Sequence, residues 1–258
     1  MPRPYKSILK EVPYMEPIYS QNFTLSDVHV NCFGRLKTSM ILYFAQEVAG
    51  NHFARLSMDY DALEQQGLFW AITRHKVQVT RLPRHGETIR VETWPMPTTR
   101  VAYPRSVVAY DADGNECFRA ITLWVLMDIR NRAMILPGKS GIQVAGTLRG
   151  NELASPLGLP SKALRSRRYR EVCFTDLDRN GHMNNTKYLD WIDDLLPASF
   201  HSGHTLKEFT VCYLSEAREG QQLQLDWDFL DENTLFMDAH RDNGDKNERV
   251  FAAKILYE

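Results

Sequence analysis

The sequence predicts an α+β protein in which one unit, a long helix followed by an antiparallel sheet, occurs twice. The order of helical and strand-like patterns in the first half recurs in the second half. Residues 77–94 also align without a gap on residues 211–228, and Gly86 then falls opposite Gly220. Between the halves, residues 137–164 contain several Pro and Gly residues and lack sustained periodicity, as is typical of a linker.

The first half opens with an extended stretch, residues 19–27, before the expected long helix over residues 36–56. Apolar residues in the helical segment recur mostly at positions that share one face of a helix. The dipeptide Asp113-Gly114 predicts a tight hairpin turn between the last two strands. The strands themselves are predicted where β-branched and aromatic residues cluster, over residues 69–82, 87–96, 101–111 and 116–128.

The second half repeats this order with a strand-like run over residues 165–176 and an amphipathic helix over residues 188–196. Three aspartates of that helix, Asp193 among them, fall on its polar face. Four strands are then predicted over residues 205–217, 221–231, 234–242 and 248–258.

The repeat defines the expected domains. We expect residues 1–136 to form the first domain, residues 165–258 to form the second, and residues 137–164 to link them. An isolated half would leave one edge of its sheet without a hydrogen-bonding partner. The two halves are therefore expected to pack side by side as a pseudo-dimer within one chain.

Composition places the chain among ordinary globular proteins and argues against several functions. Hydrophobic residues make up 43% and charged residues 24% of 258 residues, which is enough for one or two cores. A net charge of −1 offers no basic surface for nucleic acid. No apolar run is long enough to span a membrane, and the N-terminus lacks the pattern of a secretory or organellar leader. The four cysteines are scattered, so we expect reduced thiols in the cytoplasm.

Residues 176–183, DLDRNGHM, raise a choice between a calcium loop and a catalytic segment. Acidic and amide residues alternate from Asp176 to Asn180 and a glycine follows, as in an EF-hand. An EF-hand loop also needs a bidentate Glu at its twelfth position, and counting from Asp176 that position is Lys187. A strand pattern, not a helix, precedes the loop. We therefore reject calcium.

On the residues alone, this stretch is either a helix-capping turn or a functional site. Asp, Asn and Gly are the usual turn residues, and Asn184 or Asn185 is suited to cap the helix that follows. A histidine, two carboxylates and three amides within ten residues, next to a helix start, favour a site. The first half keeps Asp27 but lacks the Asp-x-Asn-x-His order, and Leu82 stands opposite Glu216. The two halves therefore differ in their chemistry.

Three longer segments carry a family signature. They are DLDRNGHMNNTKYLDWI at residues 176–192, YLSEAREG at residues 213–220 and HKVQVTRLPRHGETIRVETWP at residues 75–95. In content and order they resemble the acyl-acyl-carrier-protein thioesterases. The resemblance implies a tandem hotdog fold, with two antiparallel sheets that each wrap a central helix. It also implies hydrolysis of the thioester between a fatty acyl chain and acyl carrier protein, without a cofactor or metal.

The resemblance carries four residues into a catalytic set: Asp178, Asn180, His182 and Glu216. We expect Glu216 to act as general base on water and Asn180 to orient that water or the carbonyl. His182 would donate to the thioester oxygen or shuttle the proton, and Asp178 would fix its neighbours. Whether Glu216 or His182 takes the proton from water stays open.

Two further expectations concern groups next to this set. The backbone N–H groups of Met183 and Asn184, at the helix start, are candidate donors to the oxyanion. Plant members of the family have a Cys directly after the Glu, where this chain has Ala217, so a Cys nucleophile at that position is excluded. Cys212 is expected to be a buried structural thiol.

The expected partner is acyl carrier protein, which is acidic. The arginines of the RSRRYR run could dock it, although a solvated strand end explains such a run equally well. Trp70 is a candidate wall of the acyl tunnel. Rival functions are an acyl-CoA thioesterase of the same fold and a non-catalytic acyl-binding protein, and a homodimer is a further expectation. The docking candidates are Arg165, Arg167, Arg168 and Arg170.

Overall fold

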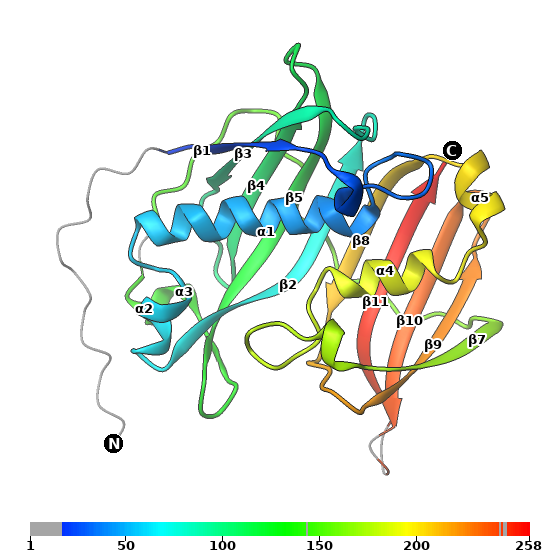
Figure 1. Cartoon of the computed structure of the whole chain (residues 1–258). Coiled ribbons are helices and arrows are strands. Elements are labelled where there is room, and N and C mark those ends of the chain that lie inside the picture. The colour runs from blue at the N-terminus through cyan, green and yellow to red at the C-terminus, as the bar shows by residue number, and fades with distance from the viewer. Residues whose placement is uncertain (1–16, 143, 243, 245–246) are drawn as a thin grey trace.

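The computed structural model describes residues 17–142, 144–242, 244 and 247–258 (Figure 1). The expectation that the chain begins without a leader concerns residues 1–16 and lies outside the described residues. Within the described part, the strands form one antiparallel sheet of eleven strands. No helix in these ranges is both long enough and apolar enough to cross a membrane.

The first half contains the long helix and the strands that the sequence predicts, with ends that differ by a few residues. The long helix is 18 residues, and the last strand matches its expected range. The short elements α2, β6 and α3 were not predicted. The elements are β1 (Tyr19–Thr24), η1 (Asp27–His29), α1 (Thr38–Arg55), α2 (Tyr60–Glu64), β2 (Leu68–Val79), β3 (Thr88–Pro95), β4 (Tyr103–Tyr110), β5 (Glu116–Asp128), β6 (Met134–Ile135) and α3 (Pro137–Ser140).

The second half repeats this order, with a shorter central helix. That helix ends at Asp193, earlier than expected, and a further short helix starts after Pro197. The expected strand over residues 205–217 ends at Tyr213, so Glu216 lies in the following loop and not on the strand. The elements are β7 (Ser166–Glu171), η2 (Phe174–Asp176), α4 (Lys187–Asp193), α5 (Ala198–Gly203), β8 (Leu206–Tyr213), β9 (Gln222–Phe229), β10 (Thr234–Asp242) and β11 (Asn247–Tyr257).

The strand order shows the internal repeat. Along the sheet it is β1-β3-β4-β5-β2 followed by β8-β11-β10-β9-β7, so the second half is the first in reverse. The halves join where β2 pairs with β8 antiparallel, with His75 opposite Val211. Gly86 and Gly220, which the sequence alignment places together, have φ angles of 82° and 77°. Only glycine adopts this conformation freely, which explains its recurrence at both turns.

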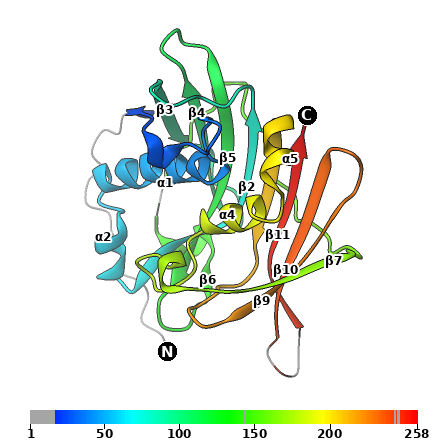
Figure 2. The ribbon, with the colours of Figure 1, turned by 45° about the vertical axis from the view of Figure 1, so that its right-hand side comes forward.

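The two central helices lie on the same side of the sheet (Figures 1 and 2). α1 packs against the strands of its own half and also contacts α4. Their apolar faces and the facing strands form one buried cluster that spans both halves and includes Phe44, Phe118, Trp191 and Phe251. Each such side chain contributes roughly 1.5–3 kcal/mol on burial. The sheet and the core are therefore continuous, as in two hotdog units joined side by side.

His75 is buried where the halves meet, and Asp193 on α4 is half-buried. His75 on β2 is bonded through Nδ1 to the Thr122 hydroxyl at 2.9 Å, and its burial lowers the pKa of its imidazole to about 3. Burial also raises the pKa of Asp193 to about 6, although His201 and the Thr38 hydroxyl both favour its charged form. Asp193 therefore lies half-buried on the polar face of the helix, near His201 and Thr38.

Candidate active site

A cavity of about 310 Å³ receives side chains from both halves of the chain. Its second-half wall contains all four residues of the expected catalytic set, Asp178, Asn180, His182 and Glu216. Its first-half wall comes from β2 and β5 and is largely apolar. The apolar side chains are Phe69, Trp70, Ile72, Trp124, Val125 and Met127. Trp70 therefore lines the same cavity as the expected catalytic set.

A tight turn between η2 and α4 brings Asp178 and His182 together. Asp178 N donates to His182 O at 2.8 Å, and Gly181 N donates to Asp178 O at 3.0 Å with a φ of 72° at the glycine. The Asp178 carboxylate accepts from the backbone N–H of Asn180 at 2.8 Å and of His182 at 3.3 Å. The alternation seen in the sequence is therefore not an extended strand. Asp178 ties the turn together from inside.

Glu216 reaches the same place from the loop between β8 and β9. Its Oε2 lies 3.0 Å from Nε2 of His182. Arg241 donates to the backbone carbonyl of Glu216 at 2.8 Å, which fixes the loop. Met183 N donates to Ala217 O at 2.8 Å, so the loop is also bonded directly to the turn that carries Asp178 and His182.

The electrostatic setting keeps His182 neutral near physiological pH. Burial lowers the pKa of the imidazole, and the positive charges of Arg132 and Arg218 lower it further. The carboxylates of Glu216 and Asp178 oppose this shift by stabilising the charged ring. The net direction of the pKa shift is downward, which favours the neutral form of the ring.

Arg132 is a member of the site that the sequence did not indicate. It lies in the turn between β5 and β6, and its guanidinium is 3.2 Å from Nε2 of His182 and 3.4 Å from Oε1 of Glu216. The same group stacks over the ring of Phe69 at 4.9 Å. No local motif surrounds Arg132, and only the pairing of the two halves brings it to the catalytic turn.

The two backbone oxyanion candidates are already bonded within the protein. Met183 N donates to Ala217 O, and Asn184 N donates to Asp176 O, both at 2.8 Å. Neither N–H is free to meet a substrate oxygen, so that expectation is wrong. The Asn184 side chain accepts from the backbone N–H of Thr186 at 2.9 Å, while Thr186 is the residue that precedes α4. Asn184 thus stabilises the turn that precedes α4, whose N-cap is Thr186 and not Asn184.

The expected docking arginines, on and just before β7, are held by neighbouring groups of the same chain. The acceptors are carboxylates on β9 and the carboxylate and backbone carbonyl of Asp194 at the end of α4, so each arginine has a partner within the chain. This favours the solvated strand end over the docking surface. The contacts are Arg165 to Asp228 at 2.5 Å, Arg167 to Asp226 at 2.7 Å, Arg170 to Asp194 at 2.6 Å and Arg168 to the Asp194 carbonyl at 3.1 Å.

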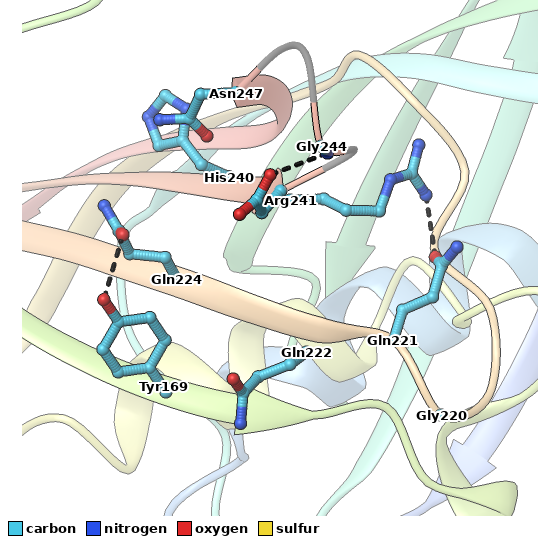
Figure 3. Close-up of a pocket in the computed structure, with 10 residues that line it drawn as sticks. Tyr169, Gly220, Gln221, Gln222, Gln224, His240, Arg241, Gly244 and Asn247 are labelled. Carbon is cyan, nitrogen blue, oxygen red and sulfur yellow. Dashed lines mark hydrogen bonds between the residues drawn. The ribbon is translucent and has the colours of Figure 1, made fainter.

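Two other features lie outside the site. Cys212 is buried at 1% exposure next to the carbonyl of Leu157, as expected of a structural thiol. A second cavity, of about 720 Å³, lies at β7, β9 and β10 (Figure 3). Tyr169 donates to Gln224 there at 3.2 Å, and Arg241 donates to Gln221 at 2.7 Å. These side chains bond one another, and none belongs to the expected catalytic set.

Comparison with known families decides the assignment. Residues 16–136 match the acyl-ACP thioesterase N-terminal domain, and residues 161–258 match the acyl-ACP thioesterase C-terminal domain. This chain belongs to the acyl-ACP thioesterase family. The two matched ranges coincide with the two halves of the sheet and meet across the linker.

Individual relatives agree with this family. The palmitoyl-acyl carrier protein thioesterase of Gossypium hirsutum is 26% identical over 235 residues, which cover 84% of this chain and 56% of that protein. The dodecanoyl-[acyl-carrier-protein] hydrolase of Cinnamomum camphora is 25% identical, covering 80% of this chain and 58% of that protein. The chain thus spans about half the length of the curated relatives it matches.

Solved structures show the same fold. An acyl-ACP thioesterase from Bacteroides thetaiotaomicron superposes with a TM-score of 0.82 at 23% identity, covering 94% of this chain and 98% of that one. The 12:0-ACP thioesterase of Umbellularia californica superposes with a TM-score of 0.79 at 20% identity, covering 93% of this chain and 97% of that one. The predicted tandem hotdog fold is confirmed.

Proposed function

We propose that this acyl-ACP thioesterase family member hydrolyses the thioester between a fatty acyl chain and acyl carrier protein. One observation carries the proposal beyond family membership. The His182 imidazole and the Glu216 carboxylate meet at 3.0 Å in a cavity whose other wall is apolar. An acid–base pair beside an apolar wall suits a substrate that has one reactive polar bond at the end of a long hydrocarbon chain.

In this proposal Glu216 is the general base. It takes a proton from water, and the water oxygen attacks the carbonyl carbon of the thioester. The tetrahedral intermediate collapses, the carbon–sulfur bond breaks, and the thiolate of the carrier's prosthetic arm leaves. Glu216 passes the proton that it took from water to Nε2 of the neutral His182 across the 3.0 Å contact, and the resulting imidazolium gives it to the thiolate. The net reaction consumes one water and yields a free acid and a thiol.

Side chains supply the donors to the developing oxyanion. The backbone N–H groups of Met183 and Asn184 already donate hydrogen bonds within the protein. We therefore assign the side-chain carboxamide of Asn180 and the imidazole N–H of His182 as the donors. Asp178 holds both residues through their backbone N–H groups. It therefore acts on the reaction through its neighbours.

The apolar wall would bind the acyl chain. Each buried methylene contributes about 0.8 kcal/mol, so the length of this wall selects chain length. Trp70 is held in this wall by a hydrogen bond from its indole N–H to Met58 O at 3.1 Å and by stacking on Phe53. A cytoplasmic location remains part of this proposal.

Matched substrates test the proposal. Hydrolysis rates are measured for acyl-carrier-protein and acyl-CoA thioesters over a series of chain lengths, with and without EDTA. Faster release from the carrier protein, unaffected by EDTA, is the expected result. Faster release from CoA would keep the site and replace the partner. Tight acyl binding without release from either would leave a non-catalytic acyl-binding protein and refute the proposed activity.

A further inference from the structure

The turn between β5 and β6 sends a charged side chain from the first half of the chain into the site. We propose that Arg132 is a positioning residue, which orients the Glu216 carboxylate and stabilises Nε2 of His182 after that atom has given up its proton. The inference rests on the proposed hydrolysis. It also means that the site is complete only when the two halves are paired.

The geometry of Arg132 fits this role. Its Nη1 lies 3.4 Å from Oε1 of Glu216, and its Nη2 lies 3.2 Å from Nε2 of His182. Stacking on Phe69 at 4.9 Å holds the guanidinium plane. Oε2 of Glu216 remains directed at His182 at 3.0 Å. Oε1 of the carboxylate therefore faces Arg132, whereas Oε2 faces His182 and also lies 3.7 Å from Nη2 of Arg218, and these contacts restrict how the carboxylate can turn.

The backbone of Arg132 supports a functional reason for the residue. Its φ angle is 55°, in the left-handed region that favours glycine. The turn does not depend on the Arg132 side chain, because the Asp128 carboxylate accepts hydrogen bonds from the backbone N–H groups of Arg130 and Asn131 at 2.8 and 3.1 Å. Backbone strain of this kind persists where a side chain serves a function. An arginine here is thus explained by what its side chain contacts.

Nε2 of His182 faces a donor and an acceptor at once. The Arg132 guanidinium only donates hydrogen bonds, so it satisfies this nitrogen when the nitrogen has no proton. The ionised Glu216 carboxylate only accepts, so it satisfies the nitrogen when a proton is present. When Nε2 of His182 loses its proton, its hydrogen-bonding partner changes from the Glu216 carboxylate to the Arg132 guanidinium. The nitrogen is therefore hydrogen-bonded in both protonation states. His182 can thus take a proton from Glu216 and give it to the departing thiolate.

The charges around His182 fix the direction of the pH effect. Glu216 and Asp178 favour the protonated ring, and Arg132 and Arg218 oppose it. Removing Arg132 takes away one opposing charge, so the pKa of His182 rises. The acidic limb of the kcat profile, where the site becomes protonated, then moves to higher pH. The side chains of Arg132 and Glu216 are each about one-third exposed, so solvent screens part of this effect.

Substitutions in one turn separate function from folding. Arg132→Met removes the charge, and Arg130→Met is the matched control two residues away, on an exposed side chain. Arg132→Lys keeps the charge but loses the planar fork. Arg132→Gly removes the side chain while relieving the left-handed backbone, so its melting temperature is expected to equal or exceed that of the wild type.

Two readouts test the proposal. The first is kcat against pH with acyl carrier protein substrate. In Arg132→Met and Arg132→Gly we expect kcat to fall on the order of 10²-fold, with the acidic limb about one pH unit higher. In Arg132→Lys the acidic limb should stay at the wild-type pH, and kcat should fall less than in Arg132→Met or Arg132→Gly. Arg130→Met should match the wild type.

The second readout is the NMR titration of His182 without substrate, assigned by the resonance that His182→Asn lacks. The expected result is titration at higher pH in Arg132→Met than in the wild type. Unchanged titration together with an unchanged kcat profile would overturn the proposal, as would a fall in kcat that only follows loss of folded protein. If the wild type hydrolyses no acyl carrier protein substrate, the proposed function fails. The titration still decides whether Arg132 acts on His182.

Discussion

Nε2 of His182 lies 3.0 Å from Oε2 of Glu216, although both residues belong to loops. What holds them is a backbone hydrogen bond from Met183 to Ala217 at 2.8 Å, between the residues that directly follow each of them. The distance between the two side chains is therefore set by main-chain pairing. This is the rigidity that an acid–base pair needs, since small displacements reduce proton transfer strongly.

The first prediction concerns the carboxylate of Glu216. Glu216→Gln keeps the shape of the side chain but removes the base, so kcat should fall on the order of 10²–10⁴-fold with little change in acyl binding. Glu219→Gln, on an exposed side chain of the same loop, is the control. Steady-state hydrolysis and binding of a non-hydrolysable acyl analogue measure the two effects. Wild-type hydrolysis by Glu216→Gln would remove Glu216 from the role of base.

The second prediction separates the charge of Asp178 from its hydrogen bonds. Asp178→Asn keeps an oxygen that can accept from the N–H groups of Asn180 and His182, whereas Asp178→Ala removes both contacts. We expect kcat to fall by on the order of 10²-fold in the alanine variant and far less in the asparagine variant. Equal losses in both variants would mean that the charge, and not the turn, is what the reaction requires.

The sequence predicted the repeat and most strands because their signals are local. β5 and β10 match their expected ranges, and each starts next to an Asx turn built around Asp111 or Asp231. The helix over residues 188–196 was predicted too long. α4 stops at Asp193, where the chain turns before Pro197, a residue that cannot continue a helix.

The grouping of Asp178, Asn180 and His182 in one turn was indicated by the sequence, because these residues are close together in the chain and follow a family order. Its shape was not, since an alternating pattern does not distinguish a strand from a tight turn around Gly181. Contacts between segments that are far apart in the sequence could not be predicted either. The pairing of Arg167 with Asp226 depends on the register of β7 against β9, and Arg132 depends on the pairing of the halves. Arg105, 1% exposed on β4, is a buried charge that no pattern indicated.

The third prediction concerns carrier-protein docking. Since Arg165 and Arg167 are paired with Asp228 and Asp226, the double variant Arg165→Gln/Arg167→Gln should leave KM for acyl carrier protein substrates within about twofold of the wild type. KM is measured at low and moderate salt, because screening would expose any electrostatic docking. A large rise in KM at low salt, absent with acyl-CoA, would restore these arginines as the docking surface.

The fourth prediction is a pH effect on stability at the junction of the halves. His75 is fully buried on β2, and burial alone lowers the pKa of its imidazole from 6.5 to about 3. The unfolded chain therefore binds a proton at His75 below pH 6.5, whereas the folded chain does so only near pH 3. It follows that stability falls as the pH drops from about 6.5 to 3, by on the order of 4 kcal/mol over the whole range.

A non-titrating variant isolates this effect. His75→Gln removes the titration, so its free energy of unfolding should depend less steeply on pH over that range, whatever its value at pH 7. His85→Gln, on a half-exposed side chain, serves as the surface control. Urea unfolding at several pH values between 4 and 7 measures the slopes. Equal slopes in His75→Gln and the wild type would place the acid sensitivity elsewhere, and the β2–β8 junction would then tolerate a charged imidazole.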